Sequence, residues 1–596
     1  MVTPKKKSNG STVKSQATSE RDRKLLAVLL CIALSAIAVV PFFFMGRSDD
    51  GDLGFSLRMP NTHDMFLHYD QMKSFYNGLA AGEVYPRWEE DTNRGFGAAT
   101  TIYYPPAIYY VTSAFYFIAR DWLRALLDAH LLIMIASAAA LFFYARETMS
   151  RRAALVAMTA YIFLPYHLAD QYQRGALAEL LGFIWMPLIL LFGERLMGET
   201  QKNAKLNGKL TAAGLLAMSY GAFLWSHPPT AYQFTLGFGL YVATRALMTR
   251  RWKGMIWIGA GLAMGLALSA AYIMPAFLEQ DLIHREYIAE TWPYHNTYVF
   301  VHDLYNTDAH RGFFHGIDAM WIFGTVVIIG SVLLMKFKLR PSFRKPELWL
   351  RMKLWIVLGG FASFMMVKLS QPLGMLIPKI EIGVFTWRML SITTLVSALL
   401  AGACAEVAIE AAKKRVRRER LVFGSLALVV VAGGLLFSAT AVVGPMMFAP
   451  VFVPVAEHLN YATLPKTAPS DPEELPDDVP RAETEGDSGR ITIERWDPEL
   501  RIIQADLETE DRLLVRTFNF PGWTAMVDGH RVDIATDEEV GDMGIELQPG
   551  SHRVTLDFVD TPPRRAGEII TICAAGLMVL LFIGSLVAGR VGQRTE

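Results

Sequence analysis

Residues 61–110 decide the fold, and they read NTHDMFLHYDQMKSFYNGLAAGEVYPRWEEDTNRGFGAATTIYYPPAIYY. The stretch follows the first long hydrophobic segment and is much richer in ionisable and aromatic residues than that segment. Its first part predicts a helix that Asn61 or Thr62 can cap and that Gly82 can end. Ionisable groups this dense beside a membrane segment indicate a functional site at the bilayer surface.

Asp64 and His68 are the first candidates for that site. Residues four positions apart lie on one face of a helix, so the carboxylate and the imidazole should be neighbours. The first turn of a helix also favours the ionised form of an acid. The acidic run Glu89, Glu90 and Asp91 is a second candidate, with a solvated loop as the alternative interpretation.

The composition is that of a polytopic membrane protein. The 596 residues are 52% hydrophobic and only 19% charged, and the mean hydropathy is +0.27. The formal net charge is +0, so no overall field recruits nucleic acid. The three cysteines all lie in hydrophobic segments and predict neither a disulfide framework nor a zinc site.

Residues 101–119 determine the predicted topology, because they are apolar enough to count as a span. If they lie along the outer surface instead, every basic loop falls on the cytoplasmic side, as the positive-inside rule requires. We therefore expect both termini inside. The expected spans are 25–46, 123–145, 153–168, 176–194, 211–226, 229–247, 254–276, 319–336, 354–369, 388–411, 421–445 and 566–588.

After the eleventh span the chain changes character. Residues 465–490 are rich in Pro, Asp, Glu and Ser, as linkers are, and alternating apolar and polar residues then predict short strands. Residues 490–560 should bury their own apolar face and fold without the membrane part. Residues 527–530 and 548–551 fit hairpin turns.

The expected divisions of the chain follow from these patterns. They are a cytoplasmic basic tail at 1–24, a transmembrane domain at 25–445 with its first outer loop at 47–122, an outer linker at 446–489, a β-rich outer domain at 490–565, the last span at 566–588 and a cytoplasmic tail at 589–596.

Four further groups should reach the same outer face as Asp64. One is the loop 279–318, whose scattered histidines lack the spacing of a zinc site. Arg174 and Glu179 flank the junction of two spans, with a structural ion pair as the alternative. His227 lies in a tight turn between two spans, where it could only brace the turn. Arg388 stands at the outer end of an apolar span, where it could also snorkel to the headgroups.

These groups fit sugar transfer from a lipid phosphate. A carboxylate can act as general base on an incoming hydroxyl. A cation near the headgroups can hold a phosphate and stabilise the charge that builds on it as it leaves. No nucleotide-binding fingerprint appears on the cytoplasmic side, so an outer reaction needs an activated donor.

The order of the motifs resembles the GT-C class of membrane glycosyltransferases. The features are a first span, a long outer loop with an acid, W-x-x-x-x-x-x-G-x-G from Trp88, and Y-Y-P-P from Tyr103. More narrowly, YHLADQYQRGALAE at 166–179, Ser-His-Pro at 226–228, IMPAFLE at 273–279, Trp-Arg at 387–388 and FPGW at 520–523 resemble one bacterial group. That group is described as "6-pyruvoyl-tetrahydropterin synthase-related" membrane proteins.

The resemblance implies an α-helical polytopic membrane protein with a GT-C-like fold, a large first outer loop and a small C-terminal β-sandwich-like outer domain. It implies a glycosyltransferase that moves a hexosyl or pentosyl group from a polyprenyl-phosphate donor to a glycan, lipid or protein acceptor. The expected place is the outer face of a bacterial plasma membrane. No cofactor is certain, and a divalent metal ion stays open.

Roles for individual residues follow from the same resemblance. Asp64 matches the catalytic acid of the first outer loop, and Glu89, Glu90 and Asp91 match a less regular second acidic position. The expected substrate-binding residues are His68, Tyr104, Arg174, Glu179, His227 and Arg388.

Two other functions stay open. The protein could be a glycolipid transporter or flippase whose outer charges only bind a headgroup, or a non-catalytic envelope assembly protein. The large outer loop and the one-sided site favour the enzyme, because transporters more often show internal repeats and polar groups near the bilayer midplane.

Overall fold

The computed structural model describes residues 10–47, 53–198, 206–291, 293–294, 297–301, 308–336, 345–383, 385–444 and 459–594. Residues 1–9 of the expected basic tail and 446–458 of the expected linker therefore lie outside the described residues.

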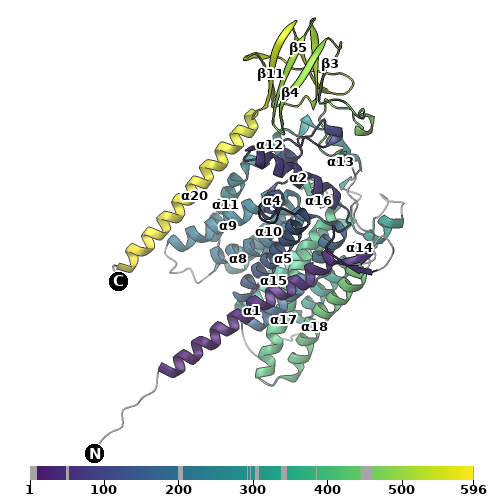
Figure 1. The fold of residues 1–596 in the computed structure, drawn as a ribbon. Helices are drawn as coiled ribbons and strands as arrows, with labels where there is room; N and C mark the ends of the chain where they lie inside the picture. The colour runs from purple at the N-terminus through teal and green to yellow at the C-terminus, as the bar shows by residue number, and fades with distance from the viewer. Residues whose placement is uncertain are drawn as a thin grey trace, which may run out of the picture.

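A bundle of long helices makes up the larger part of the molecule (Figure 1). The bundle helices are α1 (Gly10–Phe44), α5 (Trp122–Arg146), α6 (Arg151–Phe163), α7 (Pro165–Ala169), α8 (Leu177–Met197), α9 (Leu206–Ser226), α10 (Pro228–Thr249), α11 (Lys253–Leu268), α12 (Ala270–Leu278), α14 (Asp308–Lys336), α15 (Pro346–Met365), α17 (Leu390–Lys413), α18 (Arg417–Phe437) and α20 (Pro562–Arg594). The shorter helices of the connections are α2 (Met65–Ala81), α3 (Thr100–Tyr103), α4 (Ala107–Ala119), α13 (Glu286–Thr291) and α16 (Gln371–Gly374).

The chain is a multi-pass membrane protein. Eight helices in its described part are long and apolar enough to cross a membrane, or ten if each of two bent helix pairs is one span. The bent pairs are α6 with the segment from Pro165 to Arg174, and α11 with α12. The other two predicted spans coincide with α9 and α10, so each predicted span matches a helix.

Residues 101–119 do not form one continuous helix. The prolines at 105 and 106 separate α3 from α4, and α4 has 13 residues. A helix of that length extends only about 20 Å, less than the hydrocarbon core of a bilayer. This length agrees with the predicted surface position, which stays a prediction.

Two antiparallel sheets form the C-terminal β region. The strands are β3 (Ala482–Thr484), β4 (Gly489–Asp497), β5 (Leu500–Leu507), β6 (Asp511–Phe518), β7 (Trp523–Val527), β8 (His530–Val532), β9 (Ala535–Thr536), β10 (Asp542–Leu547) and β11 (Gly550–Phe558). One sheet has the order β3-β6-β10-β9 and the other β4-β5-β11-β7-β8. Buried residues alternate along β5, β6 and β11, as the sequence pattern predicts. A separate hairpin pairs β1 (Met45–Arg47) with β2 (Leu53–Phe55).

Two details of the β region differ from the sequence expectation. The predicted hairpin at 548–551 instead connects the two sheets, because β10 belongs to one sheet and β11 to the other. β3 lies within the range expected to be linker, where it pairs with β6. The predicted turn at 527–530 does join two paired strands, β7 and β8.

The core of the β region includes residues of the long connection between α1 and α5. The indole of Trp88 packs among Phe520, Trp523 and Phe558, with ring centroids 6.0, 5.5 and 5.4 Å away. Gly97 makes this possible, since a Cβ at its φ of +84° would lie 2.4 Å from the indole nitrogen. Residues 490–560 therefore share their core with the loop that contains Trp88, and their folding without the membrane part stays a prediction.

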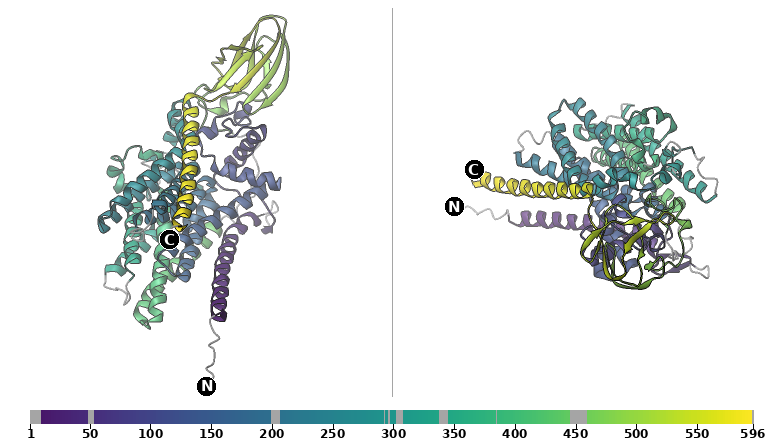
Figure 2. Two further views of the ribbon diagram at one scale, coloured as in Figure 1. Left: turned by 90° about the vertical axis from the view of Figure 1, so that its left-hand side faces the viewer. Right: turned by 90° about the horizontal axis from the view of Figure 1, so that it is seen from above.

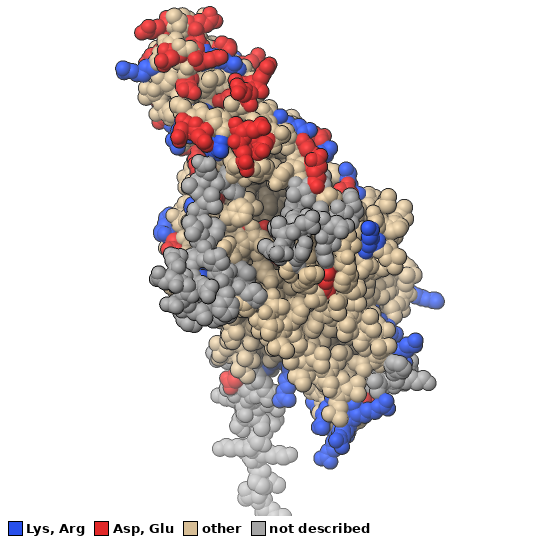
Figure 3. Space-filling model, turned by 90° about the vertical axis from the view of Figure 1, so that its right-hand side faces the viewer, with Lys and Arg blue, Asp and Glu red and all other residues tan. Residues whose placement is uncertain are grey.

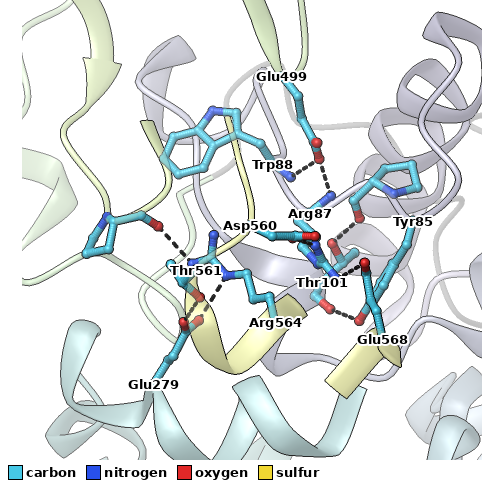
Figure 4. Close-up of polar contacts among 12 residues, drawn as sticks. Tyr85, Arg87, Trp88, Thr101, Glu279, Glu499, Asp560, Thr561, Arg564 and Glu568 are labelled. Carbon is cyan, nitrogen blue, oxygen red and sulfur yellow. Dashed lines mark hydrogen bonds and ion pairs between the residues drawn. The ribbon is translucent and has the colours of Figure 1, made fainter. Parts of the chain in front are cut away.

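Buried and partly exposed charges hold the β region and α20 to the rest of the chain (Figure 4). The Arg87 guanidinium pairs with Asp560 and, at 2.6 Å, with Glu568. The backbone amides of Arg87 and Trp88 donate to Glu499, at 2.5 and 3.2 Å. We call these residues, together with the pair below, the docking cluster.

The second part of the docking cluster joins α12 to the start of α20. Arg564 lies 3.0 Å from the Glu279 carboxylate, and the Thr561 hydroxyl donates to the same carboxylate. Glu279 and Arg564 are both buried. The docking cluster thus comprises Arg87, Glu279, Glu499, Asp560, Arg564 and Glu568.

The β region projects beyond one end of the bundle, and α1 and α20 run toward the other end (Figures 1 and 2). Lysine and arginine side chains gather at the end far from the β region, while acidic side chains cover the β region itself (Figure 3). Under the positive-inside rule this distribution is the one expected if the β region lies outside the cytoplasm, a placement that stays a prediction.

Candidate functional site

The helix predicted after residue 61 is α2, and it ends where expected. Gly82 is its C-cap, with a φ of 108° in the left-handed region. Its N-cap is Asp64 rather than Asn61 or Thr62, and the Asp64 side chain makes no capping hydrogen bond. The half-buried carboxylate is therefore not consumed by the helix end.

Backbone hydrogen bonds fix the position of Asp64. The amides of His63 and Asp64 donate to the carbonyls of Gln173 and Arg174, at 3.1 and 2.9 Å. Gly175 has a φ of +63°, and a Cβ there would lie 2.0 Å from the Thr62 hydroxyl. Only glycine allows this close approach, which sets the start of α2 against the segment 170–175.

That segment contains a π-helical turn, Asp170–Arg174, followed by α8. The Nη1 of Arg174 donates to Asp170 and Glu179, both at 2.6 Å, and to the Tyr166 hydroxyl at 3.1 Å. The Tyr166 hydroxyl in turn donates to Glu179 at 2.9 Å. Turns of this kind are frequent at functional sites, because they re-aim side chains within a helix.

Arg388 reaches the same carboxylate from another element. It lies in a 3₁₀ turn, Thr386–Met389, that leads into α17, and its Nε is 3.3 Å from Glu179. Its guanidinium also lies over the Phe385 ring, 4.8 Å from the centroid. The set Tyr166, Asp170, Arg174, Glu179 and Arg388 is called the membrane cluster below.

Asp64 lies close enough to this cluster to interact with it electrostatically. It contributes to the electrostatic environment of both Asp170 and Arg174. Tyr104 is within electrostatic range of both groups: burial raises its pKa, Asp64 raises it further, and Arg388 and Arg174 lower it. The structure thus brings Asp64, Tyr104, Arg174, Glu179 and Arg388 together.

His68 is a neutral member of the same neighbourhood. Burial lowers its pKa to about 4, although the nearby Asp64 charge raises it. Its Nδ1 is 3.2 Å from the Tyr109 hydroxyl, which donates to Gln71, so Nδ1 is assigned the proton. The His68 ring packs edge-on against Tyr104, with centroids 5.6 Å apart.

His227 caps a helix. Its Nδ1 accepts from the backbone amide of Thr230 at 3.3 Å and is 2.8 Å from the Thr230 hydroxyl, at the N-terminus of α10. This is the turn-bracing role that the sequence left open. The ring is nevertheless close enough to Glu179 and Arg388 for their charges to act on it.

The three acids of the second candidate site separate. Glu89 is buried and accepts from Thr100 at 2.5 Å, and burial raises its pKa to about 7. Glu90 lies 4.0 Å from Arg501 of the β region, and Asp91 is exposed. Of these three acids, Glu89 is the one near Asp64, since the charges of Glu89 and Asp64 both act on the Tyr109 hydroxyl.

Sequence reasoning missed Tyr109, Tyr166 and Asp170 as members of the site. Tyr166 and Asp170 both stand in the segment 166–179 that carries Arg174 and Glu179. Asp170 is four residues before Arg174, a spacing that predicts an ion pair on a helical turn. In the described parts of the chain, no three His, Cys, Asp or Glu side chains form a group that could hold a metal ion.

An apolar hollow adjoins the membrane cluster. It is lined by Tyr166, Leu164, Met320, Phe323 and Leu390, together with hydroxyls of α17. It lies between α7, α14 and α17, so it borders the cluster on the side of the spans. On another side, Figure 3 shows a recess in the surface between the β region and the bundle.

Comparison with known proteins finds similarity only among solved structures. No family model matches the chain. No curated protein matches it either, and the narrower pterin-synthase-related assignment is therefore unsupported.

Two kinds of solved structure are similar to the chain. The archaeal oligosaccharyltransferase AglB from Archaeoglobus fulgidus, in complex with an inhibitory peptide and a dolichol-phosphate, is 12% identical, with a TM-score of 0.44 over 73% of this chain. ArnT from Cupriavidus metallidurans, bound to undecaprenyl phosphate, is 14% identical, with a TM-score of 0.40 over 72% of this chain and 77% of its own.

The match to the oligosaccharyltransferase is partial in length, since the chain spans 57% of AglB. Its apo form from the same organism gives a TM-score of 0.43 at 12% identity, over 72% of this chain and 56% of that one. Similarity at this level concerns the arrangement of helices and does not assign an activity.

Proposed function

We propose that this protein is an integral membrane glycosyltransferase that moves a sugar from a polyprenyl-phosphate donor to an acceptor at the outer face of the membrane. The observation that carries the proposal is the placement of Asp64. It has a carboxylate that caps no helix, and two backbone hydrogen bonds hold it beside a buried arginine cluster at the end of the spans.

Asp64 is the general base in this proposal. The acceptor hydroxyl gives its proton to the Asp64 carboxylate while its oxygen bonds to the anomeric carbon of the sugar. The bond between that carbon and the phosphate oxygen breaks, and the lipid phosphate leaves with the bonding electrons. A carboxylate that is held in position is a suitable general base for this proton transfer.

Arg388 is the residue that we assign to the donor phosphate. Arg174 already gives its Nη1 to three oxygens of the cluster, and its two carboxylate partners are fully buried. Arg388 lies 3.3 Å from Glu179, its charge also acts on Asp170, and it stands at the start of α17. Arg174 then positions Glu179, and Glu179 orients Arg388.

The other predicted site residues have supporting roles around Asp64 and Arg388. Tyr104 and the neutral His68 form an aromatic wall suited to a sugar face, and His227 braces the start of α10. Glu89, with its pKa of about 7, is the remaining candidate for a second acid, whereas Glu90 is assigned to β-region contacts. The active face is outside the cytoplasm, at the bacterial plasma membrane.

Asp64→Asn tests the proposal. This change keeps the shape but removes the base, so sugar transfer should fall about 10²–10⁴-fold while polyprenyl-phosphate binding persists. The readout is mass spectrometry of lipid-linked sugars and acceptor glycans with purified protein in vesicles. Asp70→Asn, on the same helix, is the matched control and should leave transfer unchanged.

The same experiment addresses the transporter alternative. A flippase moves its lipid without breaking the sugar–phosphate bond, so donor lipid would cross the vesicle membrane without being consumed. Transfer by Asp64→Asn at the wild-type rate would refute the assignment of the base.

A further inference from the structure

Residues 368–379, between α15 and α17, expose an unusual number of large apolar side chains. Leu369, Met375 and Leu376 are 79, 78 and 79% exposed, and Leu373 is 44% exposed. The segment contains the short turn Lys368–Ser370 and α16. Exposed apolar side chains that lie together in this way mark a surface that a membrane or another molecule covers.

The backbone of this segment is held in place. The amides of Ser370, Met375, Leu376 and Ile377 donate to carbonyls three or four residues earlier, at 2.9 to 3.1 Å. The Tyr232 hydroxyl donates to the Pro378 carbonyl, and Ser370 and Gly374 are buried. The segment therefore has one packed side and one apolar exposed side, with much of its backbone hydrogen bonding satisfied internally.

Its position in the chain places it at the bilayer boundary. α15 ends at Met365, three residues before it, and the candidate span that contains α17 begins at Thr386. Phe364, in the last turn of α15, is itself 39% exposed, so the apolar surface continues from the span onto the segment. Figure 1 shows α16 toward the end of the bundle that bears the β region.

The charges at its two ends fit lipid phosphates. Lys368 and Lys379 flank the apolar residues and are both exposed. Glu381, the nearest acid along the chain, lies outside the pair. Lysines at the edge of an apolar surface extend their amines to the headgroups while their stems stay in the apolar layer.

We propose that residues 368–379 are a membrane-inserting wedge. Leu369, Leu373, Met375 and Leu376 enter the acyl region of the leaflet at which α15 ends, and Lys368 and Lys379 bind lipid phosphates. The internal hydrogen bonds allow this, because backbone groups in the acyl region cannot be satisfied by water. The wedge is independent of the proposed transfer reaction and anchors the chain segment that leads to Arg388.

A fluorescent probe tests the wedge. Leu376→Cys, in a Cys573→Ser background that removes the exposed native thiol, is labelled with a polarity-sensitive dye and reconstituted in phosphatidylcholine vesicles. We expect blue-shifted emission, and stronger quenching by lipids with a spin label near the headgroup than by lipids labelled near the chain end. Leu369→Cys is a second site in case position 376 does not tolerate the change.

Two control positions give the emission and quenching expected in water and in the middle of the bilayer. Arg531→Cys, exposed on β8, should report water, and Leu580→Cys, 67% exposed on α20, should be quenched by mid-chain labels. Emission at 376 and 369 equal to that at 531 would overturn the proposal. A blue shift without lipid quenching would also overturn it, because protein rather than lipid would then cover the segment.

The assignment of Lys368 and Lys379 to lipid phosphates is tested separately. Lys368→Gln together with Lys379→Gln should remove the extra quenching that phosphatidylglycerol adds over phosphatidylcholine alone. If that increment is absent in the parent, or persists in the double variant, the assignment of the two lysines to lipid phosphates fails.

Discussion

The membrane cluster and the docking cluster are ion clusters with different designs. The membrane cluster balances two arginines, 174 and 388, against two acids that are fully buried, Asp170 and Glu179. The docking cluster has two arginines, 87 and 564, and four acids, two of which keep side-chain exposures of 28 and 37%. The membrane cluster joins the segment 166–179 to the start of α17, and the docking cluster joins Arg87 and the end of α12 to the β region and α20.

This difference in the exposure of the acids indicates that the two clusters have different structural roles. Acids without any exposure are stable only while their arginines remain, so the membrane cluster is a rigid support for a site. The partly exposed acids Asp560 and Glu568 can be solvated by water when Arg87 is lost. The docking cluster therefore resembles a domain interface, in which the loss of one charge costs less stability. The predictions below would sharpen or break this distinction.

Arg174→Ala should have the largest effect on stability. It leaves Asp170 and Glu179 buried without their main partner, which costs about 3–5 kcal/mol for a buried pair. A thiol-reactive dye that detects exposure of the buried Cys31 and Cys404 on heating measures this in the Cys573→Ser background. A loss no larger than that of Arg87→Ala would remove the contrast between the clusters.

Arg388→Ala should act on the donor more than on the fold. If its guanidinium holds the phosphate, loss of a hydrogen bond to a charged group costs about 1.5–3 kcal/mol, or roughly 10–150-fold in Kd. Titration with undecaprenyl phosphate, followed by native mass spectrometry, measures this. Unchanged affinity would move the phosphate to another group, whereas Asp64→Asn should keep its affinity.

Arg87→Ala should loosen the β region without unfolding the spans. The partly exposed partners reduce the cost to about 1–3 kcal/mol. Hydrogen exchange of residues 83–99 measures the loosening, because the amides of Arg87 and Trp88 donate to Glu499. Arg565→Ala, an exposed neighbour on α20, is the matched control; equal exchange in both variants would contradict the docking role.

The two clusters also differ in how far the sequence could predict them. Arg174 and Glu179 are five residues apart at a span junction, so a helical turn accounts for their pairing. The partners of Arg87 follow 473 and 481 residues later, and no local pattern connects them. The same limit applies to Trp88, whose indole looks like an ordinary loop residue until the β region closes around it.

Helix spans and strand alternation were predictable, because each is a local periodicity. The N-cap of α2 was not, since its position depends on carbonyls of Gln173 and Arg174 more than a hundred residues away. The roles of Asp64, His68 and Arg388 in a reaction stay predictions, because they depend on where a substrate lies.

The smallest expected effect is a pH dependence of docking. Burial raises the pKa of Glu499 to about 7, and Glu83 raises it while Arg87 and the amides of Arg87 and Trp88 lower it. A carboxyl of an unfolded or undocked chain has a pKa near 4.3, so the docked state binds the proton more tightly. Docking should therefore strengthen as the pH falls through 7 toward 4.5, and the contribution is lost above 7.

Between pH 8 and pH 6 the gain is about 1.4 kcal/mol, or roughly tenfold in the protection factor of residues 83–99 once intrinsic exchange rates are divided out. Glu499→Gln is neutral at every pH and keeps an acceptor for the two amides, so it should lose this part of the dependence. Glu89 and Asp542, whose pKa values are also raised to about 7, would leave a residual slope of the same sign. If Glu499→Gln keeps the full pH dependence of the protection factor, the proton binds to another group. If protection in the parent instead falls as the pH falls, Glu499 docks as the carboxylate.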